Sequence, residues 1–415
     1  MFAFIARQPI LTGKKEVFAY ELLFRNGVND CFPESLDDDA SPSSKEILKL
    51  NLEDISCQKQ AFINFDKTTL LNGLPEILDP NNIVVEVDHL GNVDDELVNS
   101  CKRAKDQGFK IALDHLDDIN QSKLLLPFVD IVKLDVMRHP VAHNGDNISM
   151  WKDNGVKLIA EHVDTPASFE QCVDLGFDYF QGYFFSRPQA YNKKPLPSSK
   201  LSLTSLISEC NKSSFDVSAV NEIIEKDAGL SYMLLRFINN PLVNKRHKIT
   251  SLKHALTYMG EVEVKKFIAL LALANLADDK PLELLHLSLV RAKFCDLLAR
   301  EKCVGDNPPL GFLTGLFSLL DALLDQRMHD AVSQLPIVEE VKHALCGGQN
   351  QLAIYLALAK AFESATWLKV KRASDMLMME QAHCHSLFNE AIVWGNSVRQ
   401  TLSSHFPVTK TRRTS

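Results

Sequence analysis

Short apolar runs, each closed by a polar side chain, recur through the first half of the chain. Examples are Ile83-Val84-Val85 before Glu86 and Leu158-Ile159-Ala160 before Glu161. Runs of β-branched, aromatic and aliphatic residues of this length are typical of buried β-strands. The seven closing residues are Glu21, Asn64, Glu86, Asp114, Lys133, Glu161 and Gln181.

The spacing of these seven positions predicts a barrel. Successive gaps are 43, 22, 28, 19, 28 and 20 residues, and a strand–helix–strand step takes roughly 30 residues. A helix-like stretch over residues 95–105 stops at Gly108 before the next strand, as such a step requires. A closed sheet of these steps is a parallel (β/α)₈-type barrel, whose active site lies at the C-terminal strand ends. We therefore expect the seven polar side chains to meet at one mouth.

The pattern changes near residue 190, which divides the chain into predicted regions. Residues 1–190 form the predicted barrel domain, and residues 191–202, polar with two prolines, form a predicted linker. Helical periodicity follows over 203–400, including a helix with Ser251 as N-cap and Gly260 as stop. No fixed repeat is obvious there, which favours a single all-helical domain over a solenoid. Residues 401–415 are predicted to be a flexible tail.

Bulk composition indicates a cytoplasmic globular protein. The chain has 415 residues, 46% apolar and 24% charged, which is typical of globular proteins of two or three domains. The net charge of −8 argues against a general nucleic-acid binder. Nine cysteines without paired spacing indicate reduced thiols in the cytosol. Neither a signal-peptide layout nor an apolar run of the ~20 residues that a membrane span needs is present, so no membrane role is expected.

The ordered polar set resembles the EAL domain, a cyclic di-GMP phosphodiesterase. The matching segments are Glu21-Leu22-Leu23-Phe24-Arg25, Asn64, Glu86, Asp114, Lys133-Leu134-Asp135, Glu161 and Gln181-Gly182-Tyr183. The helical half resembles the HDOD domain, a non-catalytic relative of HD-type phosphohydrolases. The resemblance covers nearly the whole chain. It implies a bacterial cyclic di-GMP signalling protein with a modified TIM-like α/β barrel followed by an all-α HDOD domain.

The resemblance also implies a role for each matching residue. Mg²⁺ or Mn²⁺ prefers oxygen ligands, and the implied metal ligands are Glu21, Asn64, Glu86, Asp114 and Glu161, with His115 at a further ligand position. The implied catalytic residues beside the attacking water are Lys133, Glu161 and Gln181. Gln8, Arg25 and Pro188 are expected to bind substrate, Arg25 by gripping a phosphate with its planar guanidinium. His89 and Asp164 stand at the family's loop-bracing positions.

Two departures from the family pattern bear on hydrolysis. The second of two adjacent aspartates is His115, and the glutamate three residues after Glu86 is His89. Each lost carboxylate removes a negative charge beside a dication, and imidazole suits Zn, Ni, Fe or Cu better than Mg. The departures predict weak or lost hydrolysis, with ligand binding that can outlast it. Mg²⁺ or Mn²⁺ is expected if the site is active, and the absence of a metal cofactor is the alternative. The alternative is an active phosphodiesterase with altered metal preference that forms the linear dinucleotide.

The helical half lacks the dyad of HD enzymes. Ser318-Leu319 stand in its slot and cannot ligate a dimetal centre, and His329-Asp330 lies in a polar run typical of a surface. His383 and His385 occupy alternate helical positions that point apart. We therefore expect this domain to bind a protein partner rather than to catalyse a reaction. Because EAL barrels often pair, the resemblance also implies a homodimer through the barrel.

Overall fold

The computed structural model consists of two compact units, one built mainly from residues 1–187 and the other mainly from residues 188–415. We call them the barrel unit and the helical unit. The described residues are 4–25, 52–88, 93–114, 124–138, 145–186, 215–225, 228–240, 249–276, 280–305, 307–333 and 335–403. The predicted linker lies outside them.

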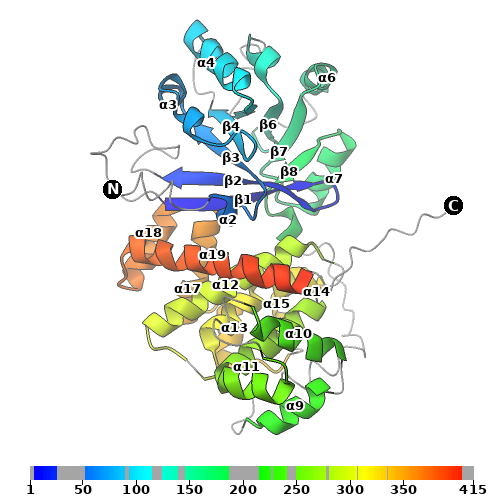
Figure 1. Ribbon diagram of the computed structural model, residues 1–415, viewed down its shortest axis with the longest axis vertical. Helices are drawn as coiled ribbons and strands as arrows, with labels where there is room; N and C mark the ends of the chain where they lie inside the picture. Colours follow the sequence, from blue (N-terminus) through cyan, green and yellow to red (C-terminus); the bar gives the residue numbers. More distant parts are fainter. Residues whose placement is uncertain are drawn as a thin grey trace, which may run out of the picture. The chain divides into compact units, whose positions relative to one another are not determined.

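Eight strands close into a barrel in the order in which they occur along the chain (Figure 1). The strands are β1 (Phe4–Thr12), β2 (Val17–Arg25), β3 (Gln60–Phe65), β4 (Ile83–Asp88), β5 (Lys110–Asp114), β6 (Ile131–Asp135), β7 (Lys157–Glu161) and β8 (Tyr179–Gln181). The predicted α/β barrel is therefore confirmed.

The first strand departs from the predicted parallel sheet. β1 runs antiparallel to both of its neighbours, β2 and β8, whereas every pair from β2 to β8 is parallel. The prediction of a wholly parallel sheet is therefore wrong at β1. Its cause is the short connection between Thr12 and Val17, since parallel strands need a crossover of a dozen residues or more.

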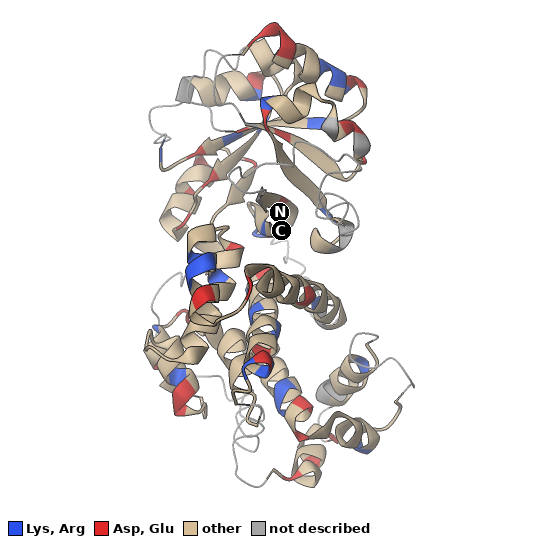
Figure 2. Ribbon diagram, turned by 90° about the vertical axis from the view of Figure 1, so that its left-hand side faces the viewer, with Lys and Arg blue, Asp and Glu red and all other residues tan. Residues whose placement is uncertain are grey.

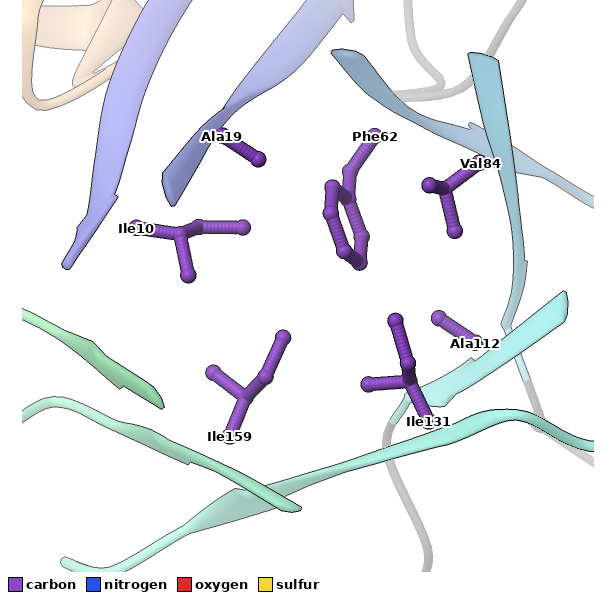
Figure 3. Packing of buried hydrophobic residues seen from close by; sticks show 7 residues of the cluster. All are labelled: Ile10, Ala19, Phe62, Val84, Ala112, Ile131 and Ile159. Carbon is purple, nitrogen blue, oxygen red and sulfur yellow. The ribbon is translucent and has the colours of Figure 1, made fainter. Parts of the chain in front are cut away.

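Side chains in the barrel interior form an apolar layer with a polar layer above it. The apolar layer consists of Ile10, Ala19, Phe62, Val84, Ala112, Ile131 and Ile159, all buried (Figure 3). Alternate residues of a strand share a face, so the residue two positions after Ala19, Glu21, faces the same interior. In antiparallel β1 the order is reversed, and Gln8 precedes Ile10. The polar positions predicted from sequence thus lie directly above the apolar layer.

Helices connect the strands of the barrel unit, and side-chain caps fix where several of them begin. They are α2 (Leu52–Ile55), α3 (Lys67–Leu71), α4 (Asp95–Asp106), α6 (Gly145–Asp153) and α7 (Pro166–Asp174), with 3₁₀ turns η1 (Leu74–Ile77), η2 (Leu126–Phe128) and η4 (Phe184–Ser186). Asp94 caps α4 by accepting the Leu97 N–H at 3.1 Å. Gly108 follows α4 with φ +94°, which confirms the predicted stop.

The helical unit contains no strand among its described residues. Its elements are α9 (Val217–Glu225), α10 (Ala228–Ile238), α11 (Leu252–Leu276), α12 (Leu282–Glu301), α13 (Leu310–Leu316), η6 (Phe317–Leu319), α14 (Leu320–Leu324), α15 (Met328–Ser333), α16 (Glu339–Leu345), α17 (Gln351–Glu363), α18 (Trp367–Met376) and α19 (Gln381–Ser403). The predicted all-helical character is confirmed.

Helix α11 shows how the predicted boundaries compare with the structure. The Ser251 hydroxyl accepts the His254 N–H at 3.2 Å, as expected of an N-cap. Gly260 has φ +73° and breaks the helical backbone, but the chain resumes a helix immediately and α11 continues to Leu276. At the other end of the unit, α19 reaches Ser403, so it extends into the region predicted as a tail. Residues 404–415 lie outside the described residues.

Charge and hydropathy of the described helices agree with the bulk composition. Figure 2 shows Lys and Arg interspersed with Asp and Glu on the helices of both units. Within the described part of the chain, every helix is too short or too polar to cross a bilayer. The described cysteines, at positions 57, 101, 172, 295, 303, 346 and 384, are all free thiols.

Candidate functional site

The amine of Lys133 lies at the centre of a buried group of carboxylates. Its Nζ is 2.7 Å from Glu86 Oε1, 2.8 Å from Glu161 Oε1, 3.1 Å from Glu21 Oε1 and 3.5 Å from Asp114 Oδ2. These residues come from five different strands, β2, β4, β5, β6 and β7. Four formal negative charges therefore face one positive charge inside the barrel, which leaves an excess of negative charge.

Each strand places its polar residue at a slightly different point along its length. Asp114, Glu161 and Gln181 are the last residues of β5, β7 and β8, as the sequence pattern predicts. Glu21 and Lys133, in contrast, lie in the middle of β2 and β6. They reach the same layer because neighbouring strands of a barrel are staggered in register. The inward face of the strand, rather than its end, is what brings these side chains together.

Burial and charge shift the pKa values of this group. The pKa of Glu161 is raised to about 8, mainly by burial and also by the charges of Asp114 and Glu21, against the lowering effect of Lys133. Burial likewise raises the pKa of Glu86 well above its usual range. For Lys133, burial alone lowers the pKa, but the surrounding carboxylates outweigh it and the net shift is well upward. The ammonium ion is thus the stable form of Lys133. The raised pKa values of Glu86 and Glu161 indicate that one ammonium does not offset the burial and mutual repulsion of the carboxylates.

Several buried oxygen atoms beside this group have no hydrogen-bond donor among the described residues. They are Asn64 Oδ1, Glu86 Oε2 and Gln181 Oε1. Glu21, Glu86 and Asp114 also each offer an oxygen within 4.8 Å of the other two. Unpaired buried acceptors are costly, and oxygen atoms are the ligands of Mg²⁺, Mn²⁺ and Ca²⁺. The residues present therefore fit a hard divalent cation.

A pocket opens above the carboxylate group. Glu21, Asp114, Lys133, Glu161 and Gln181 form the part of its lining that we call the floor. Other residues that line it include Gln8, Leu23, Asp135, Arg138, His162, Asp164 and Tyr183. The Gln181 amide donates to Gln8 Oε1 at 3.0 Å and also to the Glu21 carboxylate. The structure thus brings Gln8, which the resemblance implies as a substrate contact, to the same pocket as the carboxylates.

Other expected site residues are placed only in part. Asp164 accepts the Tyr183 N–H at 3.1 Å and so braces the segment that follows β8. Arg25 is the last residue of β2, but its side chain is not described. His89, His115 and Pro188 lie outside the described residues. Their implied roles stay predictions.

Among the charged and titratable residues that line this pocket, Asp135, Arg138 and His162 were given no role by the sequence reasoning. Asp135 stands within a segment that carries the resemblance, yet its position in the pocket required the structure. His162 has φ +55°, and no sequence pattern marks a histidine for the left-handed conformation. Arg138 lies three residues beyond its strand, where neither strand periodicity nor spacing is informative.

The helical unit offers no comparable site among its described residues. The Ser318 hydroxyl accepts from buried Arg291 Nη1 at 3.1 Å, so a hydrogen-bonded serine occupies the slot of the HD dyad. His329 lies 3.9 Å from Asp330, and its side chain is 85% exposed, consistent with the predicted surface position. His383 contacts Glu301 at 3.4 Å, whereas His385 is buried, so the two imidazoles do point apart.

Each of the two units matches a known domain family. Residues 43–188 match the EAL domain, and residues 196–345 match the HDOD domain. Gln8 and Glu21 precede the matched segment, and the barrel geometry alone places them at the site. The chain is 32% identical over 404 residues to the uncharacterized protein YuxH of Bacillus subtilis, covering 95% of this chain and 98% of that protein. It is also 32% identical over 404 residues to the cyclic di-GMP phosphodiesterase CdgJ of Vibrio cholerae, covering 96% and 94%.

Solved structures of EAL proteins are more distant. The YkuI protein of Bacillus subtilis, in complex with substrate c-di-GMP and calcium, has a TM-score of 0.35 at 19% identity and covers 55% of this chain and 71% of its own. BlrP1 of Klebsiella pneumoniae, in a calcium/cy-diGMP complex, has a TM-score of 0.34 at 22% identity. That match covers 45% of this chain and little more than half of the BlrP1 chain, 56%.

Proposed function

Because this chain belongs to the family of proteins that join an EAL domain to an HDOD domain, we propose that its barrel binds cyclic di-GMP at the Lys133 carboxylate group and hydrolyses it at a rate lowered by His115. The relative CdgJ, similar over nearly its whole length, is a cyclic di-GMP phosphodiesterase. The observation that carries the proposal is the convergence of four carboxylates on Lys133 beside the unpaired oxygens of Asn64 and Glu86.

The donor set supports a role for Mg²⁺ or Mn²⁺ in binding. Glu21, Asn64, Glu86 and Asp114 would hold the cation, and a bound divalent ion would acidify a water and neutralise phosphoryl charge. Lys133 offers an ammonium to a phosphoryl oxygen or to the attacking water. Glu161, which lines the pocket 2.8 Å from Lys133, would accept a proton from that water. Gln181, which donates to Gln8 and Glu21, would orient it.

The identity of the residue after Asp114 supports lowered hydrolysis. The family has a second aspartate there and this chain has His115, so the site holds one carboxylate fewer beside the cation. Losing one member of a catalytic set commonly lowers the rate by orders of magnitude. Arg25, Gln8 and the remaining carboxylates would still contact the ligand. Affinity for the dinucleotide should therefore outlast turnover.

Calorimetric titration and turnover assays with the full chain test this function. Wild type should bind cyclic di-GMP in Mn²⁺, and H115D should hydrolyse it at least about tenfold faster. H329D makes the same change on an exposed surface and should behave as wild type. Absence of dinucleotide binding by both wild type and H115D would refute the proposed function. Equal turnover by wild type and H115D, above all in Zn²⁺, would instead support an active enzyme with altered metal preference.

For the helical unit, the same membership supports a non-catalytic role in binding a protein partner. No group of three potential metal ligands occurs in its described residues, and Ser318 is bonded to Arg291. A chain with E21Q and E86Q should therefore lose all phosphodiesterase activity, and residual activity would contradict a non-catalytic helical unit. Sedimentation analysis of the wild type tests the expected homodimer.

A further inference from the structure

His162 adopts a backbone conformation that a glycine would adopt without strain. It follows Glu161 at the end of β7, has φ +55°, and its side chain is 63% exposed at the pocket. Non-glycine residues in this region carry strain, although histidine tolerates it better than most. Such strained residues cluster at functional sites. A histidine at this strained position therefore points to a role for its side chain.

The turn around His162 is held by backbone contacts that do not involve the imidazole. The Val163 N–H donates to the Gln181 carbonyl at 2.9 Å, and the Phe184 N–H donates to the Val163 carbonyl at 3.0 Å. Gly182 packs so closely on Val163 that an added Cβ would lie 2.2 Å from the Val163 oxygen. These contacts would persist with any residue at position 162. The fold therefore fixes the left-handed turn without needing the histidine ring.

The imidazole points instead to a carboxylate that also holds an arginine. His162 Nδ1 lies 3.3 Å from Asp135 Oδ2, and Arg138 Nε lies 3.5 Å from the same oxygen. The other oxygen, Asp135 Oδ1, accepts the N–H groups of Met137 at 2.9 Å and Arg138 at 3.2 Å. Asp135 is thus anchored by backbone N–H groups and lies beside two planar groups, the His162 imidazole and the Arg138 guanidinium. The Arg138 side chain is 66% exposed, and both residues line the pocket, at the part that we call its rim.

We propose that His162 and Arg138, positioned by Asp135, form a contact for one nucleobase of the bound ligand. Imidazole rings and guanidinium planes both stack on bases. The negative charge of Asp135 offsets the positive charge of Arg138, so the rim suits an uncharged base better than a phosphate. The phosphates would instead lie over the floor of the pocket, where a divalent cation held by the carboxylates would join Lys133 in offsetting the negative charge. This inference rests on the proposed function and names the residues that distinguish a nucleotide from a simple phosphodiester.

The chemistry of the imidazole agrees with this assignment. His162 Nδ1 faces a carboxylate oxygen at 3.3 Å, and a carboxylate oxygen only accepts hydrogen bonds, so we expect the proton of the neutral imidazole on Nδ1. In the neutral ring the other nitrogen, Nε2, is then an acceptor. Guanine offers an amino donor at its edge, which Nε2 can accept. Arg138 stacked on the face of the base and His162 accepting from its edge would together favour a purine with an exocyclic amine.

The test compares dinucleotide affinity with thermal stability in the full chain. H162G should leave the Tm unchanged or raise it, because strain is relieved, and should weaken cyclic di-GMP binding about tenfold. H162N, which also tolerates the left-handed region but lacks a ring, should show the same loss. Both variants should keep the wild-type Tm increase on adding Mn²⁺ alone, because the carboxylate group is untouched.

Gln58 provides a matched control. It is an exposed non-glycine residue of the barrel unit with φ +58°, and it does not line the pocket. Q58G should therefore relieve strain without changing affinity. Unchanged affinity in H162G, with wild type binding normally, would overturn the base contact and leave the proposed function standing. Retained affinity in H162N would also overturn it. If wild type fails to bind the dinucleotide, the proposed function and this inference fail together.

Discussion

Lys133 Nζ lies 2.7 Å from Glu86 Oε1, and neither side chain has any exposure to solvent. Three further carboxylates share the same ammonium. Burying charges is expensive, and removing one partner of a buried ion pair is more expensive still, because it strands the other charge. Lys133 therefore serves as an internal counterion in the metal-free barrel. Any cation that enters the site joins this ammonium ion in offsetting the negative charge.

Replacing Lys133 tests its role as the internal counterion of the carboxylates. In EDTA, K133M should lower the free energy of unfolding by about 3 kcal/mol, because four buried carboxylates lose their counterion. In Mn²⁺, the Tm increase should be larger than in wild type, since the carboxylates have no competing ammonium. The measurement is chemical and thermal denaturation of the full chain in both conditions.

The control for this change is a surface ion pair on the same barrel. Lys157 lies 2.8 Å from Asp178 with its side chain more than half exposed, and pairs of that kind contribute little to stability. K157M should therefore change neither the metal-free stability nor the response to Mn²⁺ noticeably. The idea of an internal counterion is wrong if K133M is as stable in EDTA as K157M.

Replacing Asn64 by leucine should change the stability in EDTA and the stabilisation by Mn²⁺ in opposite directions. Its Oδ1 is buried without a donor among the described residues, and an unpaired buried acceptor costs about 1–3 kcal/mol. N64L removes that acceptor, so stability in EDTA should be equal or higher, by about 1 kcal/mol. The Tm increase on adding Mn²⁺ should shrink, because one oxygen ligand is lost.

The isosteric variant N64D separates ligand loss from a change in shape. It adds a carboxylate to a group that already lacks positive charge, so it should be less stable than wild type in EDTA. Its response to Mn²⁺ should be retained or increased. A Mn²⁺ response in N64L equal to that of wild type would show that Asn64 is not a metal ligand.

The polar positions of the barrel were accessible from sequence because each follows an apolar residue by two positions on the same strand face. Phe62 and Asn64 on β3, and Ala112 and Asp114 on β5, illustrate this period. Periodicity along one strand does not fix strand direction. The reversal of β1 depends on the short turn before Val17. Because β1 runs in the opposite direction, its polar residue Gln8 comes two positions before the apolar Ile10 instead of two positions after it.

The rim of the pocket was not accessible in the same way. Asp135 reaches it as the last residue of β6, but Arg138 and His162 reach it through the turns that follow β6 and β7. Turn conformations depend on tertiary contacts such as the packing of Gly182 on Val163, which links segments 19 residues apart in the chain. Local sequence preference favours glycine at a left-handed position, so it points away from a histidine there. Sequence patterns therefore located the floor of the site better than its rim.

Gly182 lies in the backbone segment that links Gln181, on the floor of the pocket, to the turn of His162 and Val163 at its rim. Its φ is +144°, and a Cβ added there would lie 2.2 Å from Val163 O and 2.6 Å from Val163 C and N. Backbone atoms cannot yield as a flexible side chain can, and the bond from Val163 N–H to Gln181 O holds them in place. G182A should therefore lower the free energy of unfolding by about 3 kcal/mol or more. It should also weaken dinucleotide binding, because Gln181 adjoins the displaced segment.

Gly155 is the matched control, because its φ of +77° is also left-handed but an added Cβ would meet nothing within 4 Å. G155A should cost only the backbone strain, about 1 kcal/mol, and leave dinucleotide affinity unchanged. Urea denaturation of both variants, with calorimetric titration of whichever folds, makes the comparison. If G182A proves as stable as G155A, the close approach to Val163 does not constrain this turn. If G182A fails to fold while G155A folds, the close approach to Val163 is supported, because both positions have a positive φ but only a Cβ at position 182 would meet backbone atoms.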